Sequence, residues 1–328
     1  MKLTERFVLP LLASAAICAA EVKGGAYDLT AIRDPSTLDT RIIQDWALAP
    51  SDTSIRQKLI EITVCEWWPS QTIRLPVTLN APASGKVCEH VIVSNMGMTL
   101  RPALPAGAAL RLLKERGVGV VLIGTGEISA MAPGGRLHVG MKQHLLESKD
   151  ARFTPAWLWG ISHMRALTAA TAERKVFQPV KVLATGGSKR GMAAIAAGIF
   201  DDRFTAIVPY VAAPFGSPSG PFVLGTGSAE ISRLNEVFLS DLAAARIPNI
   251  PATARNALVE RRQRQTAGRV TTAEAEAAGW TQNDMFELNE RAWDVIRITS
   301  HLDALQKRGF EMHYIVGTND NASPALLE

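Results

Sequence analysis

The chain has 328 residues, of which 47% are hydrophobic and 20% charged, a composition typical of a globular protein with a full core. The formal net charge is +4, and the basic residues form no polybasic tail, so nucleic acid is excluded as a partner. The three cysteines form no C-x-x-C pair and no H-E-x-x-H occurs, so we expect no metal and no cofactor.

Residues 1–20 have the pattern of a secretory signal peptide. Lys2 and Arg6 precede an apolar run that is too short to span a bilayer, and small residues lead up to a cleavage point after Ala20. No other stretch is long and apolar enough for a membrane helix. We therefore expect a periplasmic or extracellular protein without stable membrane insertion, whose mature part is residues 21–328.

Two cysteines, Cys65 and Cys88, remain after that cleavage. An oxidising compartment allows them to form a disulfide, and both fall on strands that we expect to lie near each other. Two buried free thiols are the alternative, and the sequence leaves the choice open.

The first part of the mature chain predicts an irregular arm and then a hairpin. Residues 21–50 are rich in turn formers and suggest at most a short leading strand and helix. Residues 59–68 and 72–79 are typical of two antiparallel strands joined by a tight turn. Pro76 favours an edge position for the second of these strands, because proline cannot donate to a ladder.

A strand–helix–strand unit follows the hairpin. Residues 90–94 and 118–123 are continuous apolar runs, which are typical of buried parallel strands. Residues 108–116 have helical spacing and end at Gly117. Such a unit implies a right-handed crossover and therefore a parallel sheet.

The alternation continues in the second half. Residues 154–174 and 192–199 predict helices, and residues 180–184 and 204–211 predict buried strands. This pattern indicates a doubly wound α/β fold with a mostly parallel sheet. Residues 216–290 are Arg- and Ala-rich and largely helical, and we interpret them as a lid inserted over the carboxyl edge of the sheet.

The arginines of this insertion are more typical of a solvated helix face than of an anion site; they are Arg255, Arg261, Arg262, Arg264 and Arg269. Beyond the insertion, residues 291–308 predict an amphipathic helix and residues 310–317 a last strand.

The stretch Gly186-Gly187-Ser188-Lys189-Arg190-Gly191 lies between a predicted strand and a predicted helix. This is the layout of a nucleophile elbow, in which a strained turn presents a serine hydroxyl at the carboxyl edge of a sheet. The usual pattern is G-x-S-x-G, and here Arg190 stands where the second glycine is expected. The alternative is a glycine-rich turn that only packs a helix or binds an anion at the helix N-terminus.

The order of elements suggests partners for Ser188. Asp320 follows the last predicted strand, where a carboxylate can orient a catalytic base, although it also fits an Asx-type turn. The backbone N–H of Lys189 and that of Met96 or Gly97 are the expected oxyanion donors. The Arg190 side chain either contacts the substrate or braces the elbow.

The elbow residues, together with the segment 200–209 (Phe-Asp-Asp-Arg-Phe-Thr-Ala-Ile-Val-Pro), resemble the PhoPQ-activated pathogenicity-related proteins. Glucuronoyl esterases are a more distant likeness, because they share the late glycine but usually have arginine directly after the serine. The resemblance covers roughly residues 90–320 and implies an exported α/β hydrolase with a serine nucleophile, acting on a small-molecule or polymer ester or amide.

One departure from that family concerns the histidine, which should follow one more strand after Asp320. None of the histidines fits this position; they are His90, His138, His144, His163, His301 and His313. His138 and His144 are expected in a loop after Gly126, from which an approach to the site would be unusual. We therefore expect a C-terminally incomplete chain, lacking the last strand and helix, or a relative without catalysis.

The sequence thus predicts a secreted serine hydrolase with a Ser188 acyl-enzyme. The alternative is a non-catalytic binding protein on an α/β-hydrolase scaffold. A nucleotide-binding enzyme is the weakest reading, because Gly124-Thr125-Gly126 is only half of G-x-G-x-x-G.

Overall fold

A computed structural model of the chain describes residues 26–96, 100–125, 136–210, 244, 246, 251–256 and 270–315. The strands are β1 (Arg41–Ala49), β2 (Asp52–Trp68), β3 (Gln71–Pro82), β4 (Cys88–Met96), β5 (Gly119–Gly124), β6 (Phe177–Gly187), β7 (Ala206–Tyr210) and β8 (Glu311–Met312). The α-helices are α1 (Leu29–Arg33), α2 (Gly107–Arg116), α4 (Arg136–Ser148), α5 (Pro155–Ala172), α6 (Lys189–Phe200), α9 (Thr272–Ala277), α10 (Gln282–Asp294) and α11 (Leu302–Lys307). Short 3₁₀ helices are η1 (Pro35–Leu38), η2 (Ala151–Phe153) and η3 (Ile298–His301).

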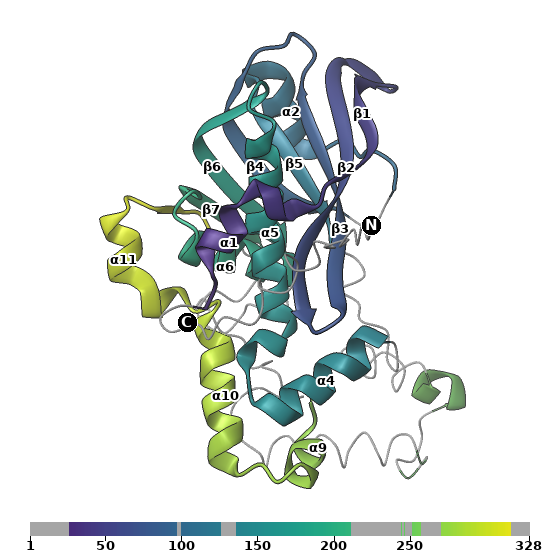
Figure 1. Ribbon diagram of the computed structural model, residues 1–328, viewed down its shortest axis with the longest axis vertical. Helices are drawn as coiled ribbons and strands as arrows, with labels where there is room; N and C mark the ends of the chain where they lie inside the picture. The colour runs from purple at the N-terminus through teal and green to yellow at the C-terminus, as the bar shows by residue number, and fades with distance from the viewer. Residues whose placement is uncertain are drawn as a thin grey trace, which may run out of the picture.

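The described strands form one mixed sheet in the order β1-β2-β3-β5-β4-β6-β7-β8 (Figure 1). The pairings from β1 to β5 are antiparallel, and those that join β5, β4, β6, β7 and β8 are parallel. The chain passes from β4 outward to β5 and then back across β4 to β6. The carboxyl ends of β4 and β6 therefore meet at a topological switch point, where ligands of open α/β sheets bind.

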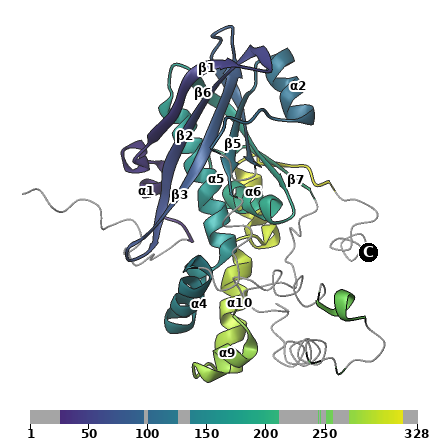
Figure 2. The same cartoon turned by 90° about the vertical axis from the view of Figure 1, so that its right-hand side faces the viewer.

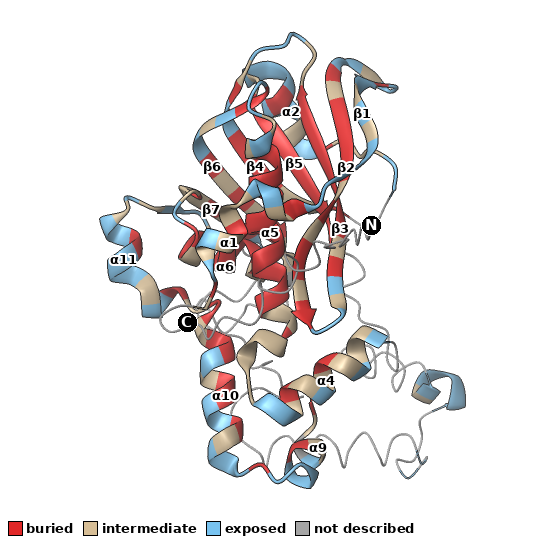
Figure 3. Cartoon of the chain, in the orientation of Figure 1, coloured by how far each residue is buried: buried red, intermediate tan, exposed pale blue. Residues whose placement is uncertain are grey.

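Helices cover both faces of this sheet, which confirms the expected α/β class. The larger apolar core lies between the sheet, α5 and α6, and a smaller one lies between the sheet and α2. Figure 3 shows β5 and α5 almost entirely buried. Burial on all sides explains why both segments are apolar without strong alternation. No helix in the described ranges is long and apolar enough to cross a membrane.

The hairpin is confirmed, but the position of Pro76 is not. β2 and β3 pair antiparallel over most of their length, with Pro76 opposite Glu61. β3 is an interior strand, so the expected edge position is wrong. The ladder between β3 and β5 begins only at Val77, opposite Ile123. The proline is tolerated because it stands just before this second ladder starts.

The two cysteines stay apart. Cys65 lies on β2 and Cys88 on β4, both are buried, and the two are not joined by a disulfide. Two strands separate them in the sheet, which corresponds to roughly 14 Å at about 4.8 Å per strand, whereas a disulfide needs Cα atoms within about 7 Å. The strand order therefore excludes the bridge that sequence permitted. Burial raises the pKa of the Cys88 thiol to about 11.

Helices α4, α9 and α10 form a small unit with its own apolar core, which we call the cap. Both views place the cap below the sheet, at the end away from α2 (Figures 1 and 2). Its buried residues are Leu145, Val270, Ala275, Trp280, Met285 and Leu288. Lys142 pairs with Glu274 at 2.7 Å, and the Trp280 indole donates to the Leu146 carbonyl at 2.9 Å. These contacts join α4 to segments more than a hundred residues later in the chain.

Two expectations fail in this region. Residues 136–148, expected as loop, form α4, and the spacing of Leu137, Met141 and Leu145 was the helical signal that was missed. Residues 291–308 are not one helix, because α10 ends at Asp294 and η3 and α11 follow. The break lies where buried Val295, Ile296 and Ile298 carry the chain from the cap into the main core. Most of the predicted lid insertion lies outside the described residues.

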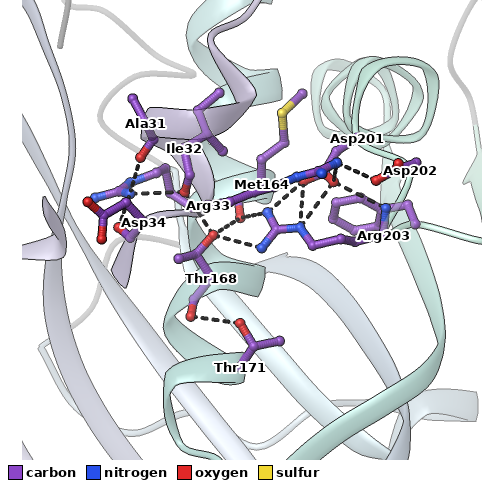
Figure 4. Close-up of polar contacts among 12 residues, drawn as sticks. Ala31, Ile32, Arg33, Asp34, Met164, Thr168, Thr171, Asp201, Asp202 and Arg203 are labelled. Carbon is purple, nitrogen blue, oxygen red and sulfur yellow. Dashed lines mark hydrogen bonds and ion pairs between the residues drawn. The ribbon is translucent and has the colours of Figure 1, made fainter. Parts of the chain in front are cut away.

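A polar cluster ties the far end of α6 to α5 and α1 (Figure 4). The Asp201 carboxylate is fully buried and accepts from Arg203 Nη2 at 2.6 Å and Arg33 Nη2 at 2.8 Å. Arg203 also donates to the Thr168 hydroxyl at 3.0 Å and the Met164 carbonyl at 3.1 Å. Asp201 and Arg203 belong to the segment that carried the family resemblance, and here their contacts are structural.

We predict that Asp201→Asn lowers the free energy of unfolding by about 3 kcal/mol, because Arg203 is then left without its buried carboxylate. The matched control is Asp202→Asn, whose side chain is 66% exposed although it also pairs with Arg33, and which should cost less than about 1 kcal/mol. Urea denaturation of both variants measures the difference. Equal losses would show that burial of the pair does not matter.

Candidate active site

The turn between β6 and α6 requires glycine at two consecutive positions. A Cβ on Gly186 would lie 2.6 Å from the Arg190 carbonyl oxygen, and one on Gly187 would lie 2.4 Å from Cε2 of the Tyr210 ring. Neither distance is tolerated between real atoms, so the helix backbone and the ring can approach only because both side chains are absent. The glycines thus allow α6 to start directly after the strand.

Ser188 occupies the tip of this turn in a strained conformation. Its φ of 53° and ψ of −125° are sparsely populated for a residue with a side chain, at a cost of about 1–3 kcal/mol. The Ser188 N–H donates to the Tyr210 carbonyl at 2.9 Å, and the Ser188 carbonyl accepts from the Met192 N–H at 3.1 Å. The residue is exposed. This is the conformation and exposure that the nucleophile-elbow interpretation requires.

The elbow stands at the carboxyl edge of the sheet, between the ends of β4 and β7. Ala184 of β6 is in register with Val93 of β4 and with Ile207 of β7. Continuing the first register by three residues brings Met96 level with Gly187. Met96, one expected oxyanion donor, therefore ends the strand beside the elbow, while its alternative Gly97 lies outside the described residues.

Two of the other expected site residues belong to the first turn of α6. Lys189 is the first residue of this helix, so its N–H has no partner within the helix. Arg190 is partly buried, and its backbone packs against Gly186.

The expected acid, Asp320, lies outside the described residues. The described chain ends at Ile315, which forms a parallel β-bridge with Tyr210. The Ile315 N–H donates to the Pro209 carbonyl at 3.1 Å. The segment that leads to Asp320 therefore starts one strand away from the elbow.

The histidines of α4 are not in the expected loop. His144 packs between the rings of Trp68 and Phe153, with centroid distances of 5.2 and 5.3 Å. Burial lowers the pKa of His138, and Glu274 of the cap weakly opposes this shift. The rings that contact His144 thus lie at the hairpin tip and in η2, and Glu274, which acts on His138, lies in α9 of the cap.

Three further histidines lie away from Ser188, as their partners on neighbouring elements show. His301 contacts Phe200, at the opposite end of α6, which the rise of an α-helix places roughly 18 Å away. His90 is exposed and in register with Lys181, seven residues before Ser188 in β6, or roughly 23 Å. His313 is exposed, and its N–H donates to Ile207, which leaves it short of the carboxyl edge.

His163 lies behind the elbow strand, fully buried in α5. Its Nδ1 lies 3.3 Å from the Trp159 carbonyl oxygen. Burial lowers the pKa of the imidazole to about 4, against weaker opposing effects of the Trp159 and Thr185 backbone. The ring is therefore neutral at pH 7 and closed off from solvent.

We predict that Ser188→Gly is more stable than Ser188→Ala by about 1 kcal/mol, because only glycine adopts this backbone conformation without strain. Ser300, which is exposed in η3, is the control site, where alanine should be the better residue. Thermal or urea unfolding of the four variants measures both differences. Equal stability of the two Ser188 variants would mean that the turn stores no strain.

The low pKa of His163 predicts a loss of stability in acid. Its folded-state value of about 4 lies below the ordinary 6.5, so the unfolded chain takes up the proton first. The contribution of neutral His163 to the free energy of unfolding is complete above pH 6.5 and declines as the pH falls. At pH 4 this decline amounts to about 3 kcal/mol.

Unfolding free energies at pH 7 and pH 4 test this effect. His163→Gln should lack this part of the decline, and the exposed-site control His90→Gln should retain it. If His163→Gln loses as much stability between pH 7 and pH 4 as the wild-type protein, the loss is not caused by His163.

No protein-family model and no curated protein match the sequence. Solved structures do resemble it in fold. An acetyl xylan esterase from Paenibacillus sp. R4 has a TM-score of 0.47 and 13% identity, over 91% of this chain and 89% of that chain. Candida antarctica lipase A in its closed state has a TM-score of 0.43 and 8% identity, over 87% and 77%.

A glucuronoyl esterase from Solibacter usitatus has a TM-score of 0.40 and 16% identity over 54% of this chain. In that alignment the chain spans 52% of the esterase, or about half its length. None of these three structures is a PhoPQ-activated protein, and that resemblance rests on the sequence motifs alone. These three solved structures are two esterases and a lipase, and each is similar to this chain at a TM-score below 0.5.

Proposed function

We propose that this protein is a serine hydrolase that cleaves an ester through an acyl-enzyme on Ser188. The observation that carries the proposal is the backbone of Ser188, an exposed serine held at positive φ between a strand and a helix, at the switch point of the sheet. Strain of this kind persists where the surrounding structure imposes it, and it concentrates at active sites. A turn that only packed a helix would have no reason to place a serine there.

The same edge of the sheet offers stabilisation for a tetrahedral intermediate. The N–H of Lys189 and that of Met96 or Gly97 are the proposed donors, each typically contributing about 3 kcal/mol to the transition state. The N-terminus of α6 adds a partial positive charge at the same place. Arg190, in the first turn, supplies a cation for a substrate carboxylate or for the developing oxyanion.

Asp320 is the proposed acid that orients the base. It follows Ile315 by five residues, a length that spans up to roughly 17 Å when extended. Ile315 is already one strand from the elbow, so this reach is sufficient.

We further propose that the cap, together with the rest of the predicted lid of residues 216–290, selects the substrate, a small-molecule or polymer ester or amide. An exported protein, cleaved after residue 20, would meet such substrates in the periplasm or outside the cell.

A second candidate function is ligand binding without catalysis. It is favoured by the placement of described histidines: the ring contacts of His144 and His301 lie away from Ser188, His90 is in register with Lys181, and His163 is buried. A serine without a base is a weak nucleophile at neutral pH. The two functions differ in one measurable property, the reactivity of the Ser188 hydroxyl.

A fluorophosphonate probe on the purified full-length protein distinguishes the two functions. We expect one labelled site, complete loss of labelling in Ser188→Ala, and normal labelling in the control Ser300→Ala, an exposed serine outside the elbow. Asp320→Asn should slow labelling by roughly a thousandfold or more if this carboxylate orients the base. A folded wild-type protein that takes up no probe would favour the binding function instead.

A further inference from the structure

Tyr210, the last residue of β7, contacts the elbow in two ways. Its carbonyl oxygen accepts from the Ser188 N–H at 2.9 Å. Its ring lies against Gly187, where a Cβ would be 2.4 Å from Cε2, 2.9 Å from Cδ2 and 3.0 Å from Cζ. Gly187 and Tyr210 are also direct partners in the parallel ladder. One residue thus contacts the elbow through its main chain and its side chain together.

Both contacts act on the same peptide unit. The peptide between Gly187 and Ser188 carries the N–H that Tyr210 binds, and the rotation of this peptide changes φ of Ser188. The Tyr210 ring lies against the Gly187 Cα at one end of this peptide. The hydrogen bond to the Tyr210 carbonyl holds the Ser188 N–H at the other end. Rotation of Ser188 toward an ordinary negative φ would break the hydrogen bond and move the chain against the ring.

Tyr210 is itself held firmly. Ile315 bridges it from the side opposite β6, and the Ile315 N–H bonds the neighbouring Pro209 carbonyl at 3.1 Å. The end of β7 therefore lies between two neighbours and does not yield to the strain at Ser188. The tyrosine is 44% exposed, with its ring lying against Gly187.

We propose that Tyr210 is a positioning residue, whose ring holds the Gly187–Ser188 peptide in place and so keeps the Ser188 hydroxyl in its reactive orientation. The proposal rests on the serine-hydrolase function proposed above. It assigns the role to the ring and the main chain, and none to the phenolic hydroxyl. The absence of a side chain at Gly187 is then a requirement of this contact as well as of the turn.

The rate of fluorophosphonate labelling tests the role of the ring, measured at a temperature where circular dichroism shows every variant to be folded. Tyr210→Ala should label at least tenfold more slowly than wild type. The conservative variant Tyr210→Phe should recover most of this loss. Val180→Ala, which removes an exposed side chain elsewhere on β6, is the control and should label normally.

A double variant tests whether the two residues act through one contact. Gly187→Ala should slow labelling, because its Cβ displaces the ring. Gly187→Ala combined with Tyr210→Ala should be no slower than the slower single variant. Three results would overturn the proposal. They are additive losses of labelling rate in the double variant, labelling of Tyr210→Ala at the wild-type rate, and labelling of Tyr210→Phe as slow as that of Tyr210→Ala. The last result would assign the role to the phenolic hydroxyl.

If the wild-type protein takes up no probe, that result refutes the proposed hydrolase function but leaves the role of Tyr210 open. A measurement of stability then tests the role of Tyr210. Ser188→Gly relieves strain only while Tyr210 maintains it. The stability difference between Ser188→Gly and Ser188→Ala should therefore fall by half or more in a Tyr210→Ala background. An unchanged difference would show that the ring does not hold the turn.

Discussion

The hydrogen bond from the Ser188 N–H to the Tyr210 carbonyl joins β6 to β7 at the point where the chain turns into α6. The strained backbone of Ser188 depends on it, and it exists only because β6 and β7 run parallel in a register that pairs Gly187 with Tyr210. The same parallel arrangement brings the end of β4 to the other side of the elbow. A single register thus sets both the conformation of the serine and its surroundings.

The elbow also needs α6 to be held along its length. Near its middle, α6 packs closely on α5, where a Cβ on Gly160 would lie 2.7 Å from the Ala196 side chain. At its far end the Asp201 cluster connects the helix to α1 and α5. Helix α6 cannot slide or tilt to relax the turn without disturbing a buried ion pair, so the strain at one end is supported by polar contacts at the other.

The cap is built differently from this rigid centre. Its small apolar core and its ion pairs join α4 to α9 and α10, although α4 precedes the elbow in sequence and the other two helices follow it. Two segments, one before and one after Ser188 in the chain, therefore meet below the sheet. Such a unit can change in sequence without altering the strands that place Ser188, which suits the substrate-selecting role proposed for it.

The sequence alone determined the alternation of strands and helices and the position of the elbow. Apolar runs such as 118–123 and the Gly-Gly-Ser turn are local patterns, and local patterns depend only on nearby residues. The resemblance to exported hydrolases also rested on such a stretch. The segment with Asp201 and Arg203 carried that resemblance, whereas its contacts show a structural role that the motif alone did not reveal.

The tertiary structure decided what depends on strand order and on distant contacts. It placed Pro76 in an interior strand, separated Cys65 from Cys88, and put His144 between two aromatic rings rather than in a loop. None of these follows from neighbouring residues, because each is set by which strands and helices lie side by side. The positive φ of Ser188 belongs to the same class, since the partner that holds it, Tyr210, is 22 residues away in the chain and adjacent only in the sheet.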